Sequence, residues 1–181
     1  MTNYNYIFTQ FPRLETKRLV LREFQESDVR NFYNMCLHED YIEEFCTEGT
    51  YISLEDAYNS ITWKYKQSFN SKEDLTWAIV LKDSGELIGS RDLFVDSPTA
   101  PIITQGYIAP NHRNKGYNQE VLDCVISFLK QANAEELVIN CSINNQPVLH
   151  IAEKLGFDDI STFQMKMIRN RCKFRLDIQE F

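Results

Sequence analysis

The sequence predicts a mixed α/β fold of the α+β class, with a mostly antiparallel sheet of six to seven strands and helices on both faces. Two observations lead to this prediction. Apolar residues change along the chain between the helical period of 3.6 and the alternation typical of strands. The 181 residues, 43% of them hydrophobic, contain no internal repeat and no Gly/Ser-rich or Pro-rich linker. We therefore expect residues 1–181 to form a single domain, with residues 1–11 as a loosely held arm.

The first part of the chain is expected to form one strand and then two helices. Residues 19–21 are a short apolar run that favours a strand. A helix follows, because apolar residues recur at its spacing at Val29, Phe32, Tyr33 and Cys36. Ser53 and Asp56 have the spacing of a capping box and predict the start of the second helix. Its apolar face is expected to comprise Tyr58, Ile61, Tyr65 and Phe69.

The middle of the chain favours three antiparallel strands. Residues 76–81 and the segment from Leu87 onwards flank the turn at residues 82–85, whose Asp and Gly tolerate the positive φ of a tight reversal. Residues 102–108 form the third strand, which ends before Pro110.

The last part alternates between helices and strands. A helix is predicted over residues 116–131 and a short apolar strand over residues 137–139. The next helix begins near Asn145, accepts a proline in its first turn because no amide donor is missed there, and stops at Gly156. We expect it to bury Val148, Ile151, Ala152 and Leu155. Alternating apolar residues over 172–178 predict a closing strand.

Composition narrows the class of protein. The formal net charge of −7 would repel a nucleic-acid backbone, so we expect no nucleic-acid partner. No apolar run approaches eighteen residues and the first residues have no secretory pattern, which predicts a cytoplasmic protein with no membrane partner. Five cysteines without a C-x-x-C pair indicate neither a disulfide framework nor a zinc site, and no metal is expected.

The segment from residue 106 to residue 118 has the pattern of an anion-binding loop. A strand ends at Pro110, polar residues follow, and a helix begins around Gly116. The first amides of a helix lack partners and carry partial positive charge, and a glycine lets a ligand approach the backbone. Arg113 and Lys115 add charge, so the loop is shaped for a phosphate or pyrophosphate. Taken alone, such a loop is more often an ordinary solvated turn.

The order of elements and several motifs together resemble the GNAT superfamily of acyl-CoA-dependent N-acetyltransferases, most closely the branch of ribosomal-protein N-terminal acetyltransferases. Residues 14–22 (LETKRLVLR) are similar to the opening strand of that branch, and residues 85–90 (GELIGS) to its hairpin. Residues 113–118 (RNKGYN) stand where the family has its R/Q-x-x-G-x-G/A pyrophosphate loop. Asn145 and residues 153–157 (EKLGF) match a second segment that faces CoA. The resemblance covers roughly residues 12–178.

The resemblance implies that acetyl-CoA is the acyl donor and assigns residues to it. The backbone of Ile108 and Ala109 would pair with the pantetheine arm as a further strand would. The pyrophosphate would be bound by the backbone amides of Arg113, Asn114, Lys115, Gly116, Tyr117 and Asn118. Asn145 would face the pantetheine amides, or would act only as the N-cap of its helix.

The chain departs from the family pattern at several positions. Asn118 stands where the family has Gly or Ala, and its side chain could crowd the phosphates or hydrogen-bond them. Val148 replaces a frequent serine, Thr104 occupies the strand position where many relatives have a glutamate base, and no tyrosine follows Tyr117 to serve as the usual acid. The catalytic residues are therefore left unassigned.

The sequence predicts an N-acetyltransferase that transfers an acetyl group to a primary amine, such as a small-molecule amine, a polyamine or a protein N-terminus. The alternative is a catalytically weak module of the same fold that binds acyl-CoA or a protein partner. The acidic run at residues 38–48 supports a cationic acceptor, with Glu43, Glu44 and Glu48 as proposed substrate-binding residues. A solvated helix face is the alternative for each of these acids. Both a monomer and a homodimer are compatible with the sequence.

Overall fold

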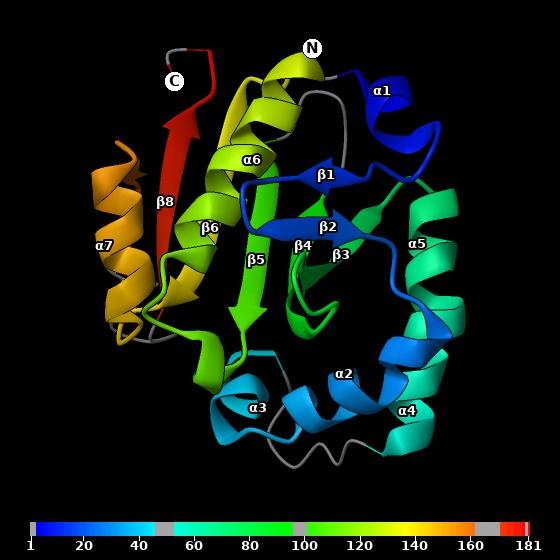
Figure 1. Cartoon of the computed structure of the whole chain (residues 1–181). Coiled ribbons are helices and arrows are strands. Elements are labelled where there is room, and N and C mark those ends of the chain that lie inside the picture. The colour runs from blue at the N-terminus through cyan, green and yellow to red at the C-terminus, as the bar shows by residue number, and fades with distance from the viewer. Residues whose placement is uncertain (1–2, 46–52, 96–100, 162–170, 180) are drawn as a thin grey trace.

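The structure of the protein is a computed structural model that describes residues 3–45, 53–95, 101–161, 171–179 and 181. Its α-helices are α1 (Tyr4–Phe8), α2 (Val29–Cys36), α3 (Glu39–Phe45), α4 (Leu54–Asn59), α5 (Tyr65–Asn70), α6 (Tyr117–Gln131) and α7 (Gln146–Lys154). Its strands are β1 (Leu14–Glu15), β2 (Leu19–Arg22), β3 (Asp74–Leu81), β4 (Leu87–Phe94), β5 (Ile102–Ile108), β6 (Glu136–Ser142), β7 (Asp158–Asp159) and β8 (Arg171–Asp177). Short 3₁₀ turns precede α2 and follow β5 (Figure 1).

The strands form one mixed sheet in the order β1-β2-β3-β4-β5-β6-β8-β7. All neighbouring strands in this sheet are antiparallel except β5 and β6, which are parallel and joined by the crossover helix α6. The predicted tight turn between β3 and β4 is confirmed, with Gly85 at φ +72°. The sheet has eight described strands where six to seven were predicted, because β1 and β7 contain two residues each and are too short to produce an alternating pattern.

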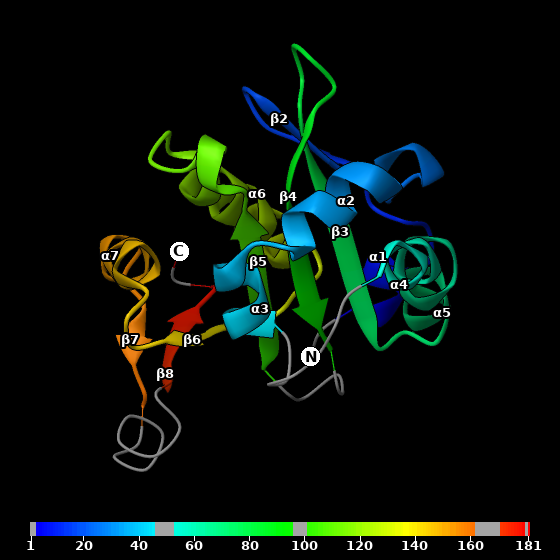
Figure 2. The same cartoon turned by 90° about the horizontal axis from the view of Figure 1, so that it is seen from below.

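Helices cover both faces of the sheet, as predicted. Alternation along β3 sends Trp77 and Ile79 into the core under α6, and sends Ala78 and Val80 into a second core under α2 and α4. Figure 1 shows α6 lying across one face of the sheet, and Figure 2 shows α3 beside the end of β5. Each face of the sheet therefore carries its own apolar core, and the central strands lie between these two cores.

The two parallel strands diverge after a short common ladder. Only three residue pairs join them, from Ile102–Leu137 to Thr104–Ile139, although β5 continues to Ile108 and β6 to Ser142. Backbone groups of the last residues of both strands are thereby left without a neighbouring strand on one side. The divergence opens the sheet at the place where α6 and α7 begin.

The first residues differ from the loosely held arm that the sequence suggests. Ile7 and Phe8 of α1 are buried in the core beneath α6, and the Asn3 amide donates to the carbonyl of Ala132 at 2.6 Å. The sequence does not predict this burial because α1 is a single short helix, and its two buried apolar residues belong to no longer periodic pattern. Ile7 and Phe8 thus contribute to the core.

The second predicted helix is interrupted by a π-helical turn at Ser60–Lys64, between α4 and α5. The capping box at Ser53 and Asp56 is confirmed. Ile61 is buried, but Tyr58, predicted on the same apolar face, is 46% exposed. The extra residue in the π-helical turn changes the angular spacing, so the i, i+3 and i+4 pattern no longer keeps one face.

The apolar face predicted for α7 is only partly inside. Ala152 is fully buried, whereas Val148, Ile151 and Leu155 are half-buried because α7 lies at the rim of the cleft described below. Among the described residues, no helix combines the length and apolar character required to cross a membrane.

Candidate functional site

A cleft of about 980 Å³ lies where β5 and β6 diverge. The end of β5, the loop before α6, the end of β6, the start of α7 and part of α3 form its walls. Of the residues predicted to bind the cofactor, the lining includes Ile108, Arg113, Asn114, Gly116, Tyr117, Asn118 and Asn145. Ala109 and Lys115 are not among the lining residues. The structure therefore brings most of the predicted set to one place.

The loop at residues 113–116 presents backbone groups to this cleft. Asn114 has φ +60° and Gly116 has φ +79°, so both lie in the left-handed region, where a residue without Cβ is least strained. Gly116 is the N-cap of α6, and no side-chain hydrogen bond caps this helix. Gly116, Tyr117 and Asn118 line the cleft, so the first turn of this fifteen-residue helix lies against it, and no hydrogen bond from a described side chain caps the helix start.

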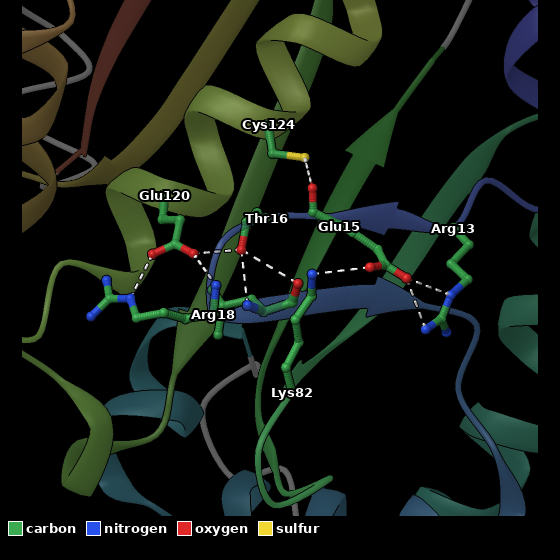
Figure 3. A network of polar contacts seen from close by, with 8 residues as sticks. Arg13, Glu15, Thr16, Arg18, Lys82, Glu120 and Cys124 are labelled. Carbon is green, nitrogen blue, oxygen red and sulfur yellow. Dashed lines mark hydrogen bonds and ion pairs between the residues drawn. The ribbon is translucent and has the colours of Figure 1, made fainter.

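The start of α6 is held by the hairpin of β1 and β2 (Figure 3). Glu120 accepts hydrogen bonds from the Thr16 hydroxyl, from the Arg18 amide at 2.8 Å and from Arg18 Nε at 2.7 Å. Arg18 Nη1 also donates to the Lys115 carbonyl at 2.9 Å. Burial alone would raise the pKa of the Glu120 carboxyl, but these bonds lower it below its usual value. The loop is therefore fixed to the sheet, and Glu120 balances the Arg18 charge.

Arg113 points to the α3 end of the cleft. Its Nε donates to the Ile108 carbonyl at 2.8 Å, and its Nη1 forms an ion pair with Asp40 Oδ2. The guanidinium carbon lies 5.0 Å from the centre of the Tyr107 ring, and the Tyr107 hydroxyl donates to Asp40 Oδ1 at 2.7 Å. Arg113 therefore joins α3 to the end of β5. The sequence gives no indication of this arrangement, because Asp40 and Arg113 are distant along the chain.

The residues predicted to face pantetheine already have some of their groups in use. The Ala109 amide donates to the Ile88 carbonyl at 2.8 Å, so it belongs to the ladder between β4 and β5. The Ile108 carbonyl accepts from Arg113, on the side from which β6 has diverged. Asn145 is the N-cap of α7, where its Oδ1 accepts from the Val148 amide at 3.4 Å, and it also lines the cleft. Both roles suggested for Asn145 are compatible with this position.

Asn118 is bonded to a residue that the sequence reasoning missed. Its Oδ1 accepts a hydrogen bond from Nη2 of Arg91, which lies on β4 and is only 3% exposed. Gly106, directly opposite Arg91 on β5, lies against the guanidinium. Gly106 is the sequence feature that could have indicated this buried arginine, since a glycine inside a strand often marks a close approach of other atoms.

Thr104 and Asp92 do not supply an accessible base. Thr104 is fully buried, and its hydroxyl donates to the Asp92 carbonyl at 2.8 Å. Asp92 is not among the lining residues of the cleft. Burial raises the pKa of Asp92 to about 6 despite a hydrogen bond with Thr76.

Three other polar side chains do line the cleft. His112 places Nε2 3.2 Å from Glu86 Oε1, and its Nδ1 is buried with no hydrogen-bond partner among the described residues. His150 lines the cleft, because α7 lies at the rim and exposes this side of the helix to it. Ser142 Oγ accepts from the Asn144 amide at 3.2 Å.

The acidic run places one described carboxylate in the cleft. Asp40 lines it, and although burial would raise the pKa of this carboxyl, hydrogen bonds from Tyr107 and Arg113 lower it below the usual value. Glu43 and Glu44 belong to α3, but their side chains lie outside the described part, as does the whole of Glu48. Asp40 was not singled out from the sequence, since alternation and helical spacing do not distinguish it from its acidic neighbours.

Asp92 leads to a prediction about stability. Because its folded-state pKa is raised, the folded protein binds the proton more tightly than the unfolded chain between pH 4 and pH 6. The free energy of unfolding should therefore fall as the pH rises through this interval. Asp92→Asn should remove that dependence and increase stability above pH 6 by about 1–3 kcal/mol. Urea unfolding from pH 4 to pH 7.5 measures the difference.

Asp56 provides a control of opposite sign for this measurement. Hydrogen bonds with Ser53 lower the pKa of its carboxyl, so its contribution is present at neutral pH and is lost on acidification. Asp56→Asn should accordingly reduce stability at pH 7 and lose its effect at low pH. If Asp92→Asn destabilised the protein equally at all pH values, the assigned cause would be wrong.

Comparisons with known proteins agree with this geometry. Residues 18–158 match the model of the acetyltransferase (GNAT) domain family. A Bacillus subtilis (strain 168) protein described as uncharacterized N-acetyltransferase YoaA is 25% identical over 170 residues, which cover 93% of this chain and 95% of that protein.

Two solved structures share the fold at low sequence identity. Mycobacterium smegmatis RimJ in complex with CoA-disulfide has a TM-score of 0.79 and 14% identity, covering 94% of this chain and 88% of that one. RimL, a ribosomal L7/L12 alpha-N-protein acetyltransferase, has a TM-score of 0.75 and 12% identity, covering 92% and 95%. The family match extends from the edge of β2 past the end of α7 and so includes the elements that form the walls of the cleft. The chain belongs to the GNAT acetyltransferase family and is an acyltransferase.

Proposed function

We propose that the protein transfers an acetyl group from acetyl-CoA to a cationic primary amine, either a small molecule or a peptide N-terminus, in the cytoplasm. The observation that carries this proposal is the cleft between β5 and β6, into which the uncapped start of α6 points. The wall formed by the start of α6 offers backbone amides, and the wall formed by α3 carries the Asp40 carboxylate. A donor and an acceptor can thus meet between the two diverging strands.

The donor side fits an acyl-CoA. Amides at the start of α6 suit the pyrophosphate, and the open edge of β5 at Ile108 suits an extended amide-containing arm. A volume of about 980 Å³ is at the upper end of the range for small-molecule sites and suits a long cofactor. The RimJ neighbour, which was solved with CoA-disulfide, supports the same class of donor.

The acceptor side fits a cation at the α3 end. Asp40 lines the cleft there, but its charge is balanced by Arg113, so Glu43, Glu44 and Glu48 are proposed to supply the negative charge that attracts the cation. Acids on one side of a cleft raise the local concentration of a cation. The name of the RimL neighbour, an alpha-N-protein acetyltransferase, supports a peptide N-terminus as one candidate.

The reaction requires no covalent enzyme intermediate. The neutral amine nitrogen would attack the thioester carbonyl carbon, and the C–S bond would break as the thiolate leaves and takes up a proton. Holding both reactants in one cleft lowers the entropic part of the barrier. The residue that accepts the amine proton is left unassigned.

A screen of amines and N-terminal peptides tests this proposal. Purified protein is incubated with acetyl-CoA, and the released CoA thiol is measured together with the mass of the acetylated product. We expect release to depend on a cationic amine. Turnover with no amine, or with neutral nucleophiles alone, would contradict the proposed acceptor.

The acidic run provides a prediction within this proposal. Replacing Glu43, Glu44 and Glu48 together by glutamine should raise the KM for the cationic acceptor by about 3–10-fold at low salt, because three attractive charges are lost. The difference should shrink as the salt concentration rises. A control that neutralises Glu73, Asp83 and Asp177 changes the net charge equally outside the cleft lining. An equal rise in KM for both variants would reject a local role.

The alternative is a module of the same fold that binds acyl-CoA or a protein partner with weak turnover. Thr104 favours it, since a fully buried threonine stands where many relatives have a base. Thermal stabilisation by acetyl-CoA without release of thiol to any amine in the screen would support this second function.

A further inference from the structure

Arg91 is a buried cation with an incomplete set of partners. It is 3% exposed, and Nη2 donates to Asn118 Oδ1. Its Nε is buried and has no hydrogen-bond partner among the described residues. Burial lowers the pKa of Arg91 to about 10, so the side chain remains charged at neutral pH. A buried charge without a full set of hydrogen-bond partners destabilises the folded protein unless an opposite charge lies close to it.

The nearest acid does not supply that compensation by contact. Asp92 is adjacent on β4, but neighbouring side chains on a strand point to opposite faces, and its carboxyl bonds to Thr76. Arg91 lies on the face covered by α6, where Glu120 is already engaged by Arg18 and Thr16. The helix start adds partial positive charge near Asn118. The Glu120 charge is thus balanced by Arg18, and no described carboxylate forms an ion pair with Arg91.

The strand opposite is built to admit Arg91. A Cβ atom at Gly106 would lie 2.5 Å from Arg91 Cζ and 2.6 Å from Nε, so only glycine leaves room for the guanidinium. Gly106 and Asn118 both line the cleft. The guanidinium thus lies directly behind the cleft wall, between the end of β5 and the first turn of α6.

We propose that Arg91 is a positioning residue for the donor, whose guanidinium orients Asn118 and supplies the buried positive charge that favours the pyrophosphate. This inference rests on the proposed use of acetyl-CoA. It also accounts for Asn118, which stands where the family has Gly or Ala. The Asn118 carboxamide accepts the hydrogen bond that holds the Arg91 guanidinium, and Gly106 leaves the space that the guanidinium occupies.

Two variants separate the charge of Arg91 from its structural contact. Arg91→Met removes the charge and keeps the length of the side chain. Asn118→Asp keeps the contact and strengthens it as an ion pair, but cancels the charge and places a carboxylate beside the pyrophosphate. A purely structural role predicts that Arg91→Met impairs turnover with and without a pyrophosphate on the donor to the same extent, whereas the proposed role predicts a loss that is confined to pyrophosphate-bearing ligands. Arg91→Lys, which keeps the charge, should recover part of the affinity.

Titration calorimetry with CoA measures the effect, and thermal melting checks the fold. We expect about 10–100-fold weaker CoA binding for Arg91→Met and for Asn118→Asp, in line with the loss of one charge-assisted interaction. The second readout is turnover of S-acetylpantetheine, which has no pyrophosphate, with an amine from the screen. For Arg91→Met, the kcat/KM for S-acetylpantetheine should stay within about twofold of the wild-type value.

The outcomes distinguish this inference from the proposed function. CoA affinity within about twofold of wild type in both variants would overturn the role of Arg91 while leaving the acetyltransferase intact. Equal losses with CoA and with S-acetylpantetheine would show a structural role alone and would also overturn it. A wild-type protein that binds no CoA would reject the proposed function and the inference together.

Discussion

Replacement of Gly116 by valine is expected to reduce acetyl-CoA affinity by at least about 100-fold, because two or more charge-assisted amide hydrogen bonds would be lost. Gly116 has φ +79° at the N-cap of α6. A β-branched residue is strained in this region by about 1–3 kcal/mol, and the loop would relax away from the conformation that presents the amides. The nearest side-chain atom to a Cβ at this position is Arg18 Nη2 at 3.5 Å, so backbone strain is the main cause.

A matched variant isolates this cause. Gly85 has φ +72° in the turn between β3 and β4, and a Cβ atom added to it would meet no other atom within 4 Å. It is also not among the lining residues of the cleft. Gly85→Val should therefore lower the melting temperature to a similar extent while CoA binding stays close to wild type. Calorimetry and thermal melting of both variants give the comparison. Unchanged CoA affinity in Gly116→Val would show that the donor binds elsewhere.

The second large effect is expected for Arg113→Ala, at the acceptor end. Removing the guanidinium eliminates the hydrogen bond to the Ile108 carbonyl, the ion pair with Asp40 and the contact with the Tyr107 ring. Hydrogen bonds that involve a charged group contribute about 1.5–3 kcal/mol each. Since α3 would keep only the Tyr107 hydrogen bond and ring contacts to β5, its position at the acceptor end would loosen. We expect kcat/KM for the amine to fall by about 100-fold, with a smaller change in CoA affinity.

This result would decide between two roles of Arg113. If its charge served mainly the pyrophosphate, as the pattern of the loop predicts, CoA affinity would fall as much as kcat/KM for the amine. Tyr107→Phe is the graded control, because it removes one hydrogen bond to Asp40 and leaves the ion pair in place. We expect a loss of about 3–10-fold for it. Steady-state kinetics in the amine and CoA titrations together provide both quantities.

Much of the fold could be predicted because the signals are local. Alternation predicted β8, and the strand expected before Pro110 is β5. The capping box at Ser53 predicted the start of α4, and a strand followed by a glycine-bearing loop predicted the start of α6. The family resemblance then identified the loop at residues 113–118, most of which does line the cleft. The local pattern failed at Tyr58, where a π-helical turn shifted the helical face, and at α1, which is too short to have a period.

The sequence by itself determined that the chain forms a mixed sheet covered by helices and that an anion-binding loop opens α6. Only the tertiary structure decided which charges surround that loop. Arg113 turns to Asp40, Arg18 is paired with Glu120, and Arg91 lies buried behind Gly106. The physical reason is that helical and strand periods specify the face on which a side chain lies. The carboxylate or amide that an arginine side chain contacts depends on how distant strands and helices pair, and no local pattern in the sequence specifies that pairing.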